Sequence, residues 1–151
     1  MKKYFTLSNC LKACAALLGL VAFFLMFANQ LYAEVLGSRG YVEFSDAMFG
    51  DYGSVITFVG YLLFFLSAAG ACALTFLGMD AKSKKYASLG LAFLFVLAAI
   101  FVFIEAGVVN GRLDASMYHL TAAPVIAGIL GILAGLAVAL SEFVPDKALL
   151  K

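Results

Sequence analysis

Glu105 is the residue of this 151-residue chain that most invites a chemical role. It lies in the stretch FVFIEAGVV (101–109), where it is the only charged residue. A carboxylate in a segment that crosses a membrane is a functional hypothesis by default, because burying its charge in lipid is costly. Three more polar residues stand near the ends of apolar segments, which gives four candidates for a polar site: Glu105, Asn29, Gln30 and Arg112. They predict either a path for a proton or cation, or helix ends that reach for water.

Histidine and cysteine are too sparse to build an enzyme or a metal centre. His119 is the only histidine, and the three cysteines are Cys10, Cys14 and Cys72. A structural zinc site takes four clustered Cys or His ligands, and no such cluster is present. The chain also lacks a phosphate-binding glycine loop and a basic nucleic-acid-binding patch. We therefore expect a protein that is not an enzyme, with no metal, no cofactor and no nucleic-acid partner.

The composition indicates an integral membrane protein. Hydrophobic residues make up 65% of the chain and charged residues only 13%, whereas soluble domains carry about 25% charged residues. A soluble domain of this size has too little interior to bury so much apolar surface. The apolar residues also run in long blocks, without the alternation that is typical of a membrane β-barrel.

Four of these blocks are long enough to cross a bilayer as helices. A hydrocarbon core of about 30 Å needs roughly 20 helical residues at about 1.5 Å each. The sequence therefore predicts an all-α, single-domain bundle of four transmembrane helices, at 11–33, 55–78, 88–110 and 121–143. The loops between them cover 34–54, 79–87 and 111–120.

The placement of lysine and arginine predicts the orientation, because positive residues near the ends of spans favour the cytoplasmic side. Two of the ten, Arg39 and Arg112, fall on the side of the first and third loops. The other eight fall on the opposite side: Lys2, Lys3, Lys12, Lys82, Lys84, Lys85, Lys147 and Lys151. Three acidic residues share that side: Asp80, Glu142 and Asp146. The side carries a net charge of +5 (eight minus three), so we expect both termini to be cytoplasmic, in a bacterial inner membrane or a plasma membrane.

The first outer loop, 34–54, is long enough to have structure of its own. YVEF (41–44) alternates like a short strand, and SDAMFG (45–50) is typical of a helical turn that begins at Ser45 and ends at Gly50. We expect the loop either to contact a partner or to cover the helix ends as a lid. Four of its side chains are the expected contact: Tyr41, Phe44, Met48 and Phe49.

Small residues recur every four positions along the fourth predicted helix: Ala123, Ala127, Gly131, Gly135 and Ala139. Gly131 and Gly135 form a GxxxG pair. Such a stripe lets another helix approach closely, which favours packing inside a membrane. The approaching helix belongs either to this chain or to another molecule.

Two functions fit these features. We expect a small non-enzymatic membrane protein, a structural or accessory subunit that packs against itself or a larger membrane protein through the fourth helix and the first outer loop. The alternative is an oligomeric channel or transporter module for a cation or small solute. In that case Glu105 has a direct role; otherwise it pairs with Arg112, or meets Asn29, Gln30 or Arg39 across the bundle. No polar residue marks the midplane, where transporter sites usually lie, and this favours the accessory subunit.

Overall fold

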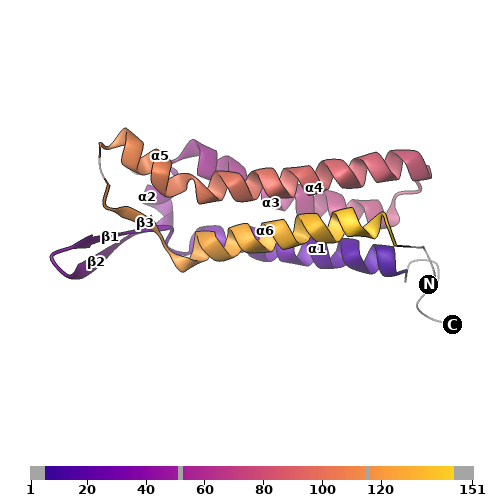
Figure 1. The fold of residues 1–151 in the computed structure, drawn as a ribbon, viewed down its shortest axis with the longest axis horizontal. Helices are drawn as coiled ribbons and strands as arrows, with labels where there is room; N and C mark the ends of the chain where they lie inside the picture. The colour runs from indigo at the N-terminus through magenta and orange to yellow at the C-terminus, as the bar shows by residue number, and fades with distance from the viewer. Residues whose placement is uncertain (1–5, 51–52, 115, 145–151) are drawn as a thin grey trace.

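Four long helices form an elongated bundle within the described residues (6–50, 53–114 and 116–144) of a computed structural model, and a small β-sheet lies at one end (Figure 1). These helices are long and apolar enough to cross a membrane: α1 (Leu7–Phe24, continued by the 3-10 turn η2, Leu25–Phe27), α3 (Val55–Phe76), α4 (Ala81–Phe103) and α6 (Ala122–Ser141). We call the two ends of the bundle the sheet end and the opposite end; α1 begins and α6 ends at the opposite end. Four of the lysines used to predict orientation lie outside the described residues: Lys2, Lys3, Lys147 and Lys151.

Side chains cap the first turns of α1, α3 and α4. Thr6 Oγ1 accepts a hydrogen bond from the Asn9 amide at 3.2 Å. Ser54 and Asp80 accept equivalent bonds at the starts of α3 and α4, at 3.3 and 2.9 Å. These oxygens satisfy amides that a helix leaves without partners at its first turn. The caps therefore fix where three of the long helices begin.

The third long helix begins earlier than the sequence predicts and is interrupted before its expected end. Because Asp80 caps it, α4 starts at Ala81, and most of the predicted loop 79–87 is helical. Three lysines consequently lie on the first turns of α4: Lys82, Lys84 and Lys85. At Ile104 the helix is interrupted, and a short helix, α5 (Glu105–Arg112), follows. The first residue of this short helix is Glu105, which the sequence places inside a continuous span.

The sheet joins two loops that lie far apart in the sequence. β1 (Leu31–Val35) pairs antiparallel with β2 (Ser38–Val42) on one edge and with β3 (Tyr118–Leu120) on the other. The strand order is β2-β1-β3. The fold is mostly helical, but the predicted all-α class is wrong in this part, because the two loops predicted at 34–54 and 111–120 both supply strands to one sheet.

The β1–β2 hairpin replaces the end of the first predicted helix. The helical conformation stops at Phe27, so the part of the predicted span from 28 to 33 is extended. Leu36 and Gly37 have φ values of 51° and 79°, and positive φ at both central positions is what a tight type I′ hairpin turn requires. The strand predicted at 41–44 starts earlier, at Ser38, and gives way to the short helix α2 (Phe44–Met48).

The small-residue stripe of α6 packs against aromatic and backbone groups of the same chain. A Cβ atom on Gly131 would collide with the ring of Phe64 in α3, and one on Gly135 would lie 3.0 Å from the Ala92 carbonyl oxygen of α4. Ala127, one turn closer to the sheet end than Gly131, is fully buried. Two further members of the stripe are half-buried: Ala123 and Ala139. At Gly131 and Gly135 the groove is therefore occupied by α3 and α4 of the same chain.

Candidate functional site

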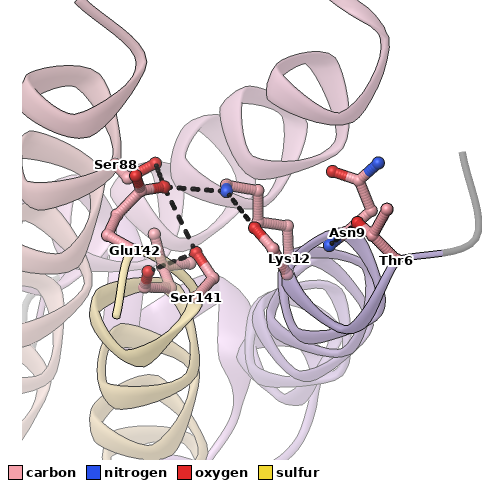
Figure 2. A network of polar contacts seen from close by, with 8 residues as sticks. Thr6, Asn9, Lys12, Ser88, Ser141 and Glu142 are labelled. Atoms are coloured by element: carbon pink, nitrogen blue, oxygen red, sulfur yellow. Dashed lines mark hydrogen bonds and ion pairs between the residues drawn. The ribbon is translucent and has the colours of Figure 1, made fainter. Parts of the chain in front are cut away.

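A buried ion pair lies at the opposite end of the bundle, between α1 and α6 (Figure 2). Lys12 Nζ is 2.8 Å from Glu142 Oε1 and also donates to Ser8 Oγ at 3.0 Å. Ser88 of α4 donates its hydroxyl to the same Glu142 oxygen at 2.7 Å. The Lys12 side chain is fully buried and that of Glu142 nearly so. The cluster thus ties three helices together through charge-assisted hydrogen bonds, which are stronger than neutral ones.

The local sequence explains how these groups meet. Ser8 and Lys12 are four residues apart and therefore lie one above the other on one face of α1. Glu142 directly follows the last residue of α6, so its carboxylate lies at the helix end. Burial alone would raise the pKa of Glu142, but the hydrogen bonds from Lys12 and Ser88 and the positive charges of Lys12 and Lys84 outweigh burial and hold this pKa below its usual range. The carboxylate is therefore ionised at neutral pH.

A polar cavity of about 240 Å³ adjoins the ion pair. Its lining includes three charged residues, two serines and three apolar residues: Lys12, Lys84, Glu142, Ser8, Ser141, Met79, Ala81 and Val144. From the sequence, both lysines are interpreted only as signals of orientation, so this site is not predicted. The available signal is the Ser8–Lys12 spacing within an otherwise apolar helix; the partner carboxylate lies too far along the chain for any local pattern to indicate it.

Gln30 forms the centre of a second buried polar cluster, at the sheet end. Its side-chain amide donates to the carbonyls of Leu25, Met26 and Ala28 at 2.6–3.0 Å. Its Oε1 accepts the hydroxyl of Tyr61 in α3 at 2.6 Å. Both side chains are fully buried. Gln30 therefore satisfies the carbonyls that become free where the first helix ends, and it binds this end of α1 to α3.

Glu105 is fully buried near this cluster, and neither of its carboxylate oxygens has a hydrogen-bond partner within the described chain. It lies near Tyr61 of α3. Gly60 of α3 packs against Val102 of α4. Thr57 lies about one turn from Gly60 toward the sheet end, and Glu105 follows Val102 just after the break at Ile104. Among the described residues, the buried Thr57 hydroxyl also has no hydrogen-bond partner. Burial raises the pKa of Glu105 to about 8, so the carboxyl holds a proton at neutral pH.

Arg112 and Asn29, the other two polar candidates, do not bind Glu105. Arg112 Nη1 donates to the Gly53 carbonyl at 2.6 Å, and the expected Glu105–Arg112 pair is not formed. Two helical turns separate them along α5. Asn29 is exposed, and its carbonyl accepts the hydroxyl of Thr121. Of the four predicted residues, the structure gathers only Glu105 and Gln30 around one buried group, Tyr61.

The predicted contact residues of the first outer loop divide into exposed and buried ones. Tyr41 and Phe49 have 55% and 68% of their surface exposed. Phe44 is half-buried, with its ring 4.9 Å from that of Phe27. Met48 is only 2% exposed, because α2 turns it toward the bundle together with Ala47. Met48 is therefore buried within the chain, whereas the sequence predicts it as a contact residue.

One face of the sheet carries a row of rings. Tyr32 of β1 lies between Tyr41 and His119, with ring centroids 6.5 and 5.4 Å apart, and the Arg39 guanidinium stands 5.3 Å from the Tyr32 ring. Arg39 also forms an exposed ion pair with Glu34 at 3.9 Å. An open cavity of about 460 Å³ lies between this face and the start of α6. The sheet end therefore offers an aromatic and partly charged surface.

The chain matches no protein-family model, no curated protein and no solved structure. Within residues 6–50, 53–114 and 116–144, no three His, Cys, Asp or Glu side chains gather into a group that could hold a metal ion. The two buried polar clusters and the exposed sheet are thus the features from which a function is to be inferred.

Proposed function

We propose that this chain is a non-enzymatic multi-pass membrane protein that acts as a structural or accessory subunit and contacts its partner through the sheet end. Its four long helices span the bilayer, with the sheet on the outer side and the termini in the cytoplasm. The observation that carries the proposal is an apolar hairpin tip, Val35 and Leu36, held out from a sheet that is firmly fastened to the bundle.

Residues before and after β3 fasten the sheet to the bundle. The Thr121 amide donates to the Gln30 carbonyl at 3.0 Å, next to the end of the sheet. Asn110 of α5 donates to the Tyr118 carbonyl at 2.9 Å and accepts from the Tyr118 amide at 3.1 Å. These bonds fix the sheet to α5 and to the start of α6. A surface that is rigid before binding loses less conformational entropy on association.

The exposed hairpin tip destabilises the free chain, and contact with a partner would offset this cost. Leu36 is fully exposed and has positive φ, a backbone conformation that glycine or asparagine adopts with less strain. Val35 beside it is half exposed, and Tyr41 and Phe49 add two exposed rings. Aromatic side chains are enriched at protein interfaces. This combination favours a contact surface outside the bilayer over the lid that the sequence leaves as the alternative.

The small-residue stripe argues in the same direction. Gly131 and Gly135 face Phe64 and Ala92 of the same chain, so the closest-packing face of α6 is occupied. A contact with a second molecule then falls to other surfaces, and the sheet end is the one with its own structure and exposed apolar groups.

Crosslinking in native membranes tests the proposal with Leu36→Asn. Asparagine tolerates positive φ, so the variant keeps the hairpin and removes only the apolar tip. The wild type is expected to give a crosslinked complex of defined mass, and Leu36→Asn is expected to lose most of it. Leu77→Asn is the matched control, because it removes an exposed leucine near the opposite end. A lone monomer in native mass spectrometry of the gently solubilised wild type contradicts the proposal.

The second candidate is a channel or transporter module, and the buried Glu105 without a hydrogen-bond partner is the observation that favours it. A carboxyl that exchanges a proton or cation between two sides needs such a site. Flux through reconstituted vesicles separates the two functions. Ion flux that is abolished by Glu105→Gln supports the transport module, and the absence of flux for any tested ion or solute rules it out.

A further inference from the structure

The cavity beside the Lys12–Glu142 pair has the donors of an anion site. Lys12 uses two of its three N–H groups on Ser8 and Glu142. Lys84 is half-buried at the cavity, and its positive charge acts on Glu142. Its backbone amide donates to the Asp80 carbonyl, but its ammonium group makes no hydrogen bond or ion pair with any residue that the structure describes. Among the described residues that line the cavity, two ammonium groups and one carboxylate give a net charge of +1. One N–H group of Lys12 and the whole ammonium of Lys84 thus remain for a ligand.

We propose that this cavity binds a phosphate group, either the headgroup phosphate of an anionic phospholipid or a free phosphate. Lysine binds phosphate as a point charge, and the Ser8 hydroxyl, which accepts from Lys12, can donate its own proton to a phosphate oxygen. The cavity, at about 240 Å³, has room for the group. It lies where three helices converge, so a ligand there bridges α1, α4 and α6.

The position favours the lipid as the source. The cavity opens at the end of the bundle where α1 begins and α6 ends, the end that the charge distribution assigns to the cytoplasmic leaflet. Basic pockets between transmembrane helices on that side are typical binding sites of anionic headgroups. This inference does not depend on the contact proposed for the sheet end, and either can fail without the other.

The lipid arm of the test uses the full chain in nanodiscs of phosphatidylcholine with phosphatidylglycerol. After extraction in mild detergent, native mass spectrometry measures how much phosphatidylglycerol each chain retains. A lysine near an anionic headgroup contributes about 1 kcal/mol, which corresponds to about a fivefold change in affinity. Lys84→Gln is therefore expected to lower retention about fivefold. Lys82→Gln removes the same charge from an exposed site on the same helix that does not line the cavity, and it is expected to retain the lipid.

The free-phosphate arm uses delipidated protein in a neutral detergent. An amine-reactive reagent labels lysines, and peptide mass spectrometry measures the labelling rates of Lys84 and Lys82 with and without inorganic phosphate. Phosphate that slows the labelling of Lys84 but not of Lys82, without selective retention of phosphatidylglycerol, identifies a free phosphate as the ligand. Retention that Lys84→Gln lowers identifies the lipid.

The proposal is overturned if neither arm distinguishes the two positions. In that case Lys84→Gln and Lys82→Gln retain equal amounts of phosphatidylglycerol, and phosphate slows the labelling of Lys84 and Lys82 equally. This pair of results would show that only the general positive charge of this end attracts anions. Ser8→Ala gives a second variant that keeps both charges and removes only the hydroxyl. It is expected to weaken the binding of either probe by a smaller factor than Lys84→Gln.

Discussion

The Lys12 ammonium lies 2.8 Å from the Glu142 carboxylate, and this contact fastens the beginning of α1 to the end of α6. Ser88 adds α4 to the same oxygen. Because both charges are largely withdrawn from water, each depends on the other for its solvation. The pair therefore works as a clamp between helices that are first and last in the bundle.

Lys12→Met tests the clamp. Removing one member of a buried pair leaves the other charge without compensation and destabilises by about 3 kcal/mol. Thermal unfolding followed by circular dichroism in detergent is expected to show this loss. The double variant Lys12→Met with Glu142→Gln is expected to recover most of it, since no charge is then stranded. Lys85→Met, at an exposed position of α4, is the control; a double variant as unstable as the single one contradicts the interpretation.

Because of the buried Glu105, we expect the free energy of unfolding to fall as the pH rises. Its pKa is raised to about 8 in the folded chain from an ordinary value of 4.5, so the unfolded chain loses this proton at lower pH than the folded chain does. Stability is then greatest below the unfolded pKa and falls by up to about 4 kcal/mol between about pH 5 and about pH 8. It levels off once the folded carboxyl has also ionised.

Glu105→Gln is expected to flatten this pH dependence and to raise the unfolding temperature above neutral pH. Unfolding measured across the same pH range checks both effects. His119→Gln is the control, because it replaces the single histidine of the sequence and leaves Glu105 in place. If wild type and Glu105→Gln show the same slope, the carboxyl is not the group responsible.

The four long helices could be predicted from the sequence because their signal is local. Length and hydropathy within each block are sufficient, and the structure has helices long and apolar enough to span at all four places. The sheet could not be predicted in this way. β1 and β3 are separated by two of the long helices, so their pairing depends on the bundle having formed. The first predicted helix is present, but its predicted end at residue 33 is wrong for the same reason, since residues 31–33 belong to β1 and pair with strands that the sequence does not reveal.

The polar clusters were predicted only in part. Glu105 and Gln30 stand out because they are polar residues in apolar surroundings. Tyr61, which donates to Gln30 and lies near Glu105, does not stand out, because tyrosines are common in apolar segments of membrane proteins. Lys12 is a positive residue near a helix start, which the orientation rule already explains. Its role as a buried partner becomes visible only when Glu142 is placed beside it.

A larger side chain in place of a glycine is expected to destabilise the bundle only where another helix packs against that glycine. Leucine at Gly131 would have to displace the Phe64 ring, and overpacking of this kind typically costs about 1–3 kcal/mol. Gly131→Leu is therefore expected to lower the unfolding temperature of the bundle. Gly90→Leu in α4 is the matched control, because no described atom outside the neighbouring backbone of its own helix and its two chain neighbours lies within 4 Å of the position of its Cβ. It is expected to be neutral or slightly stabilising, since leucine favours the helix more than glycine does. Equal losses in the two variants would contradict the packing of α6 against α3.

Tyr61→Phe is expected to lower the local stability of the sheet end. The change removes the hydroxyl that donates to Gln30 Oε1 at 2.6 Å and leaves that buried oxygen without its partner, at a cost of about 1–3 kcal/mol. Because the Gln30 backbone carbonyl accepts from Thr121 next to the sheet, amide exchange in β1 is expected to accelerate. Tyr86→Phe, which changes an exposed ring, is the control and should leave exchange unchanged. Unaltered β1 exchange in Tyr61→Phe would show that Gln30 holds the sheet without help from α3.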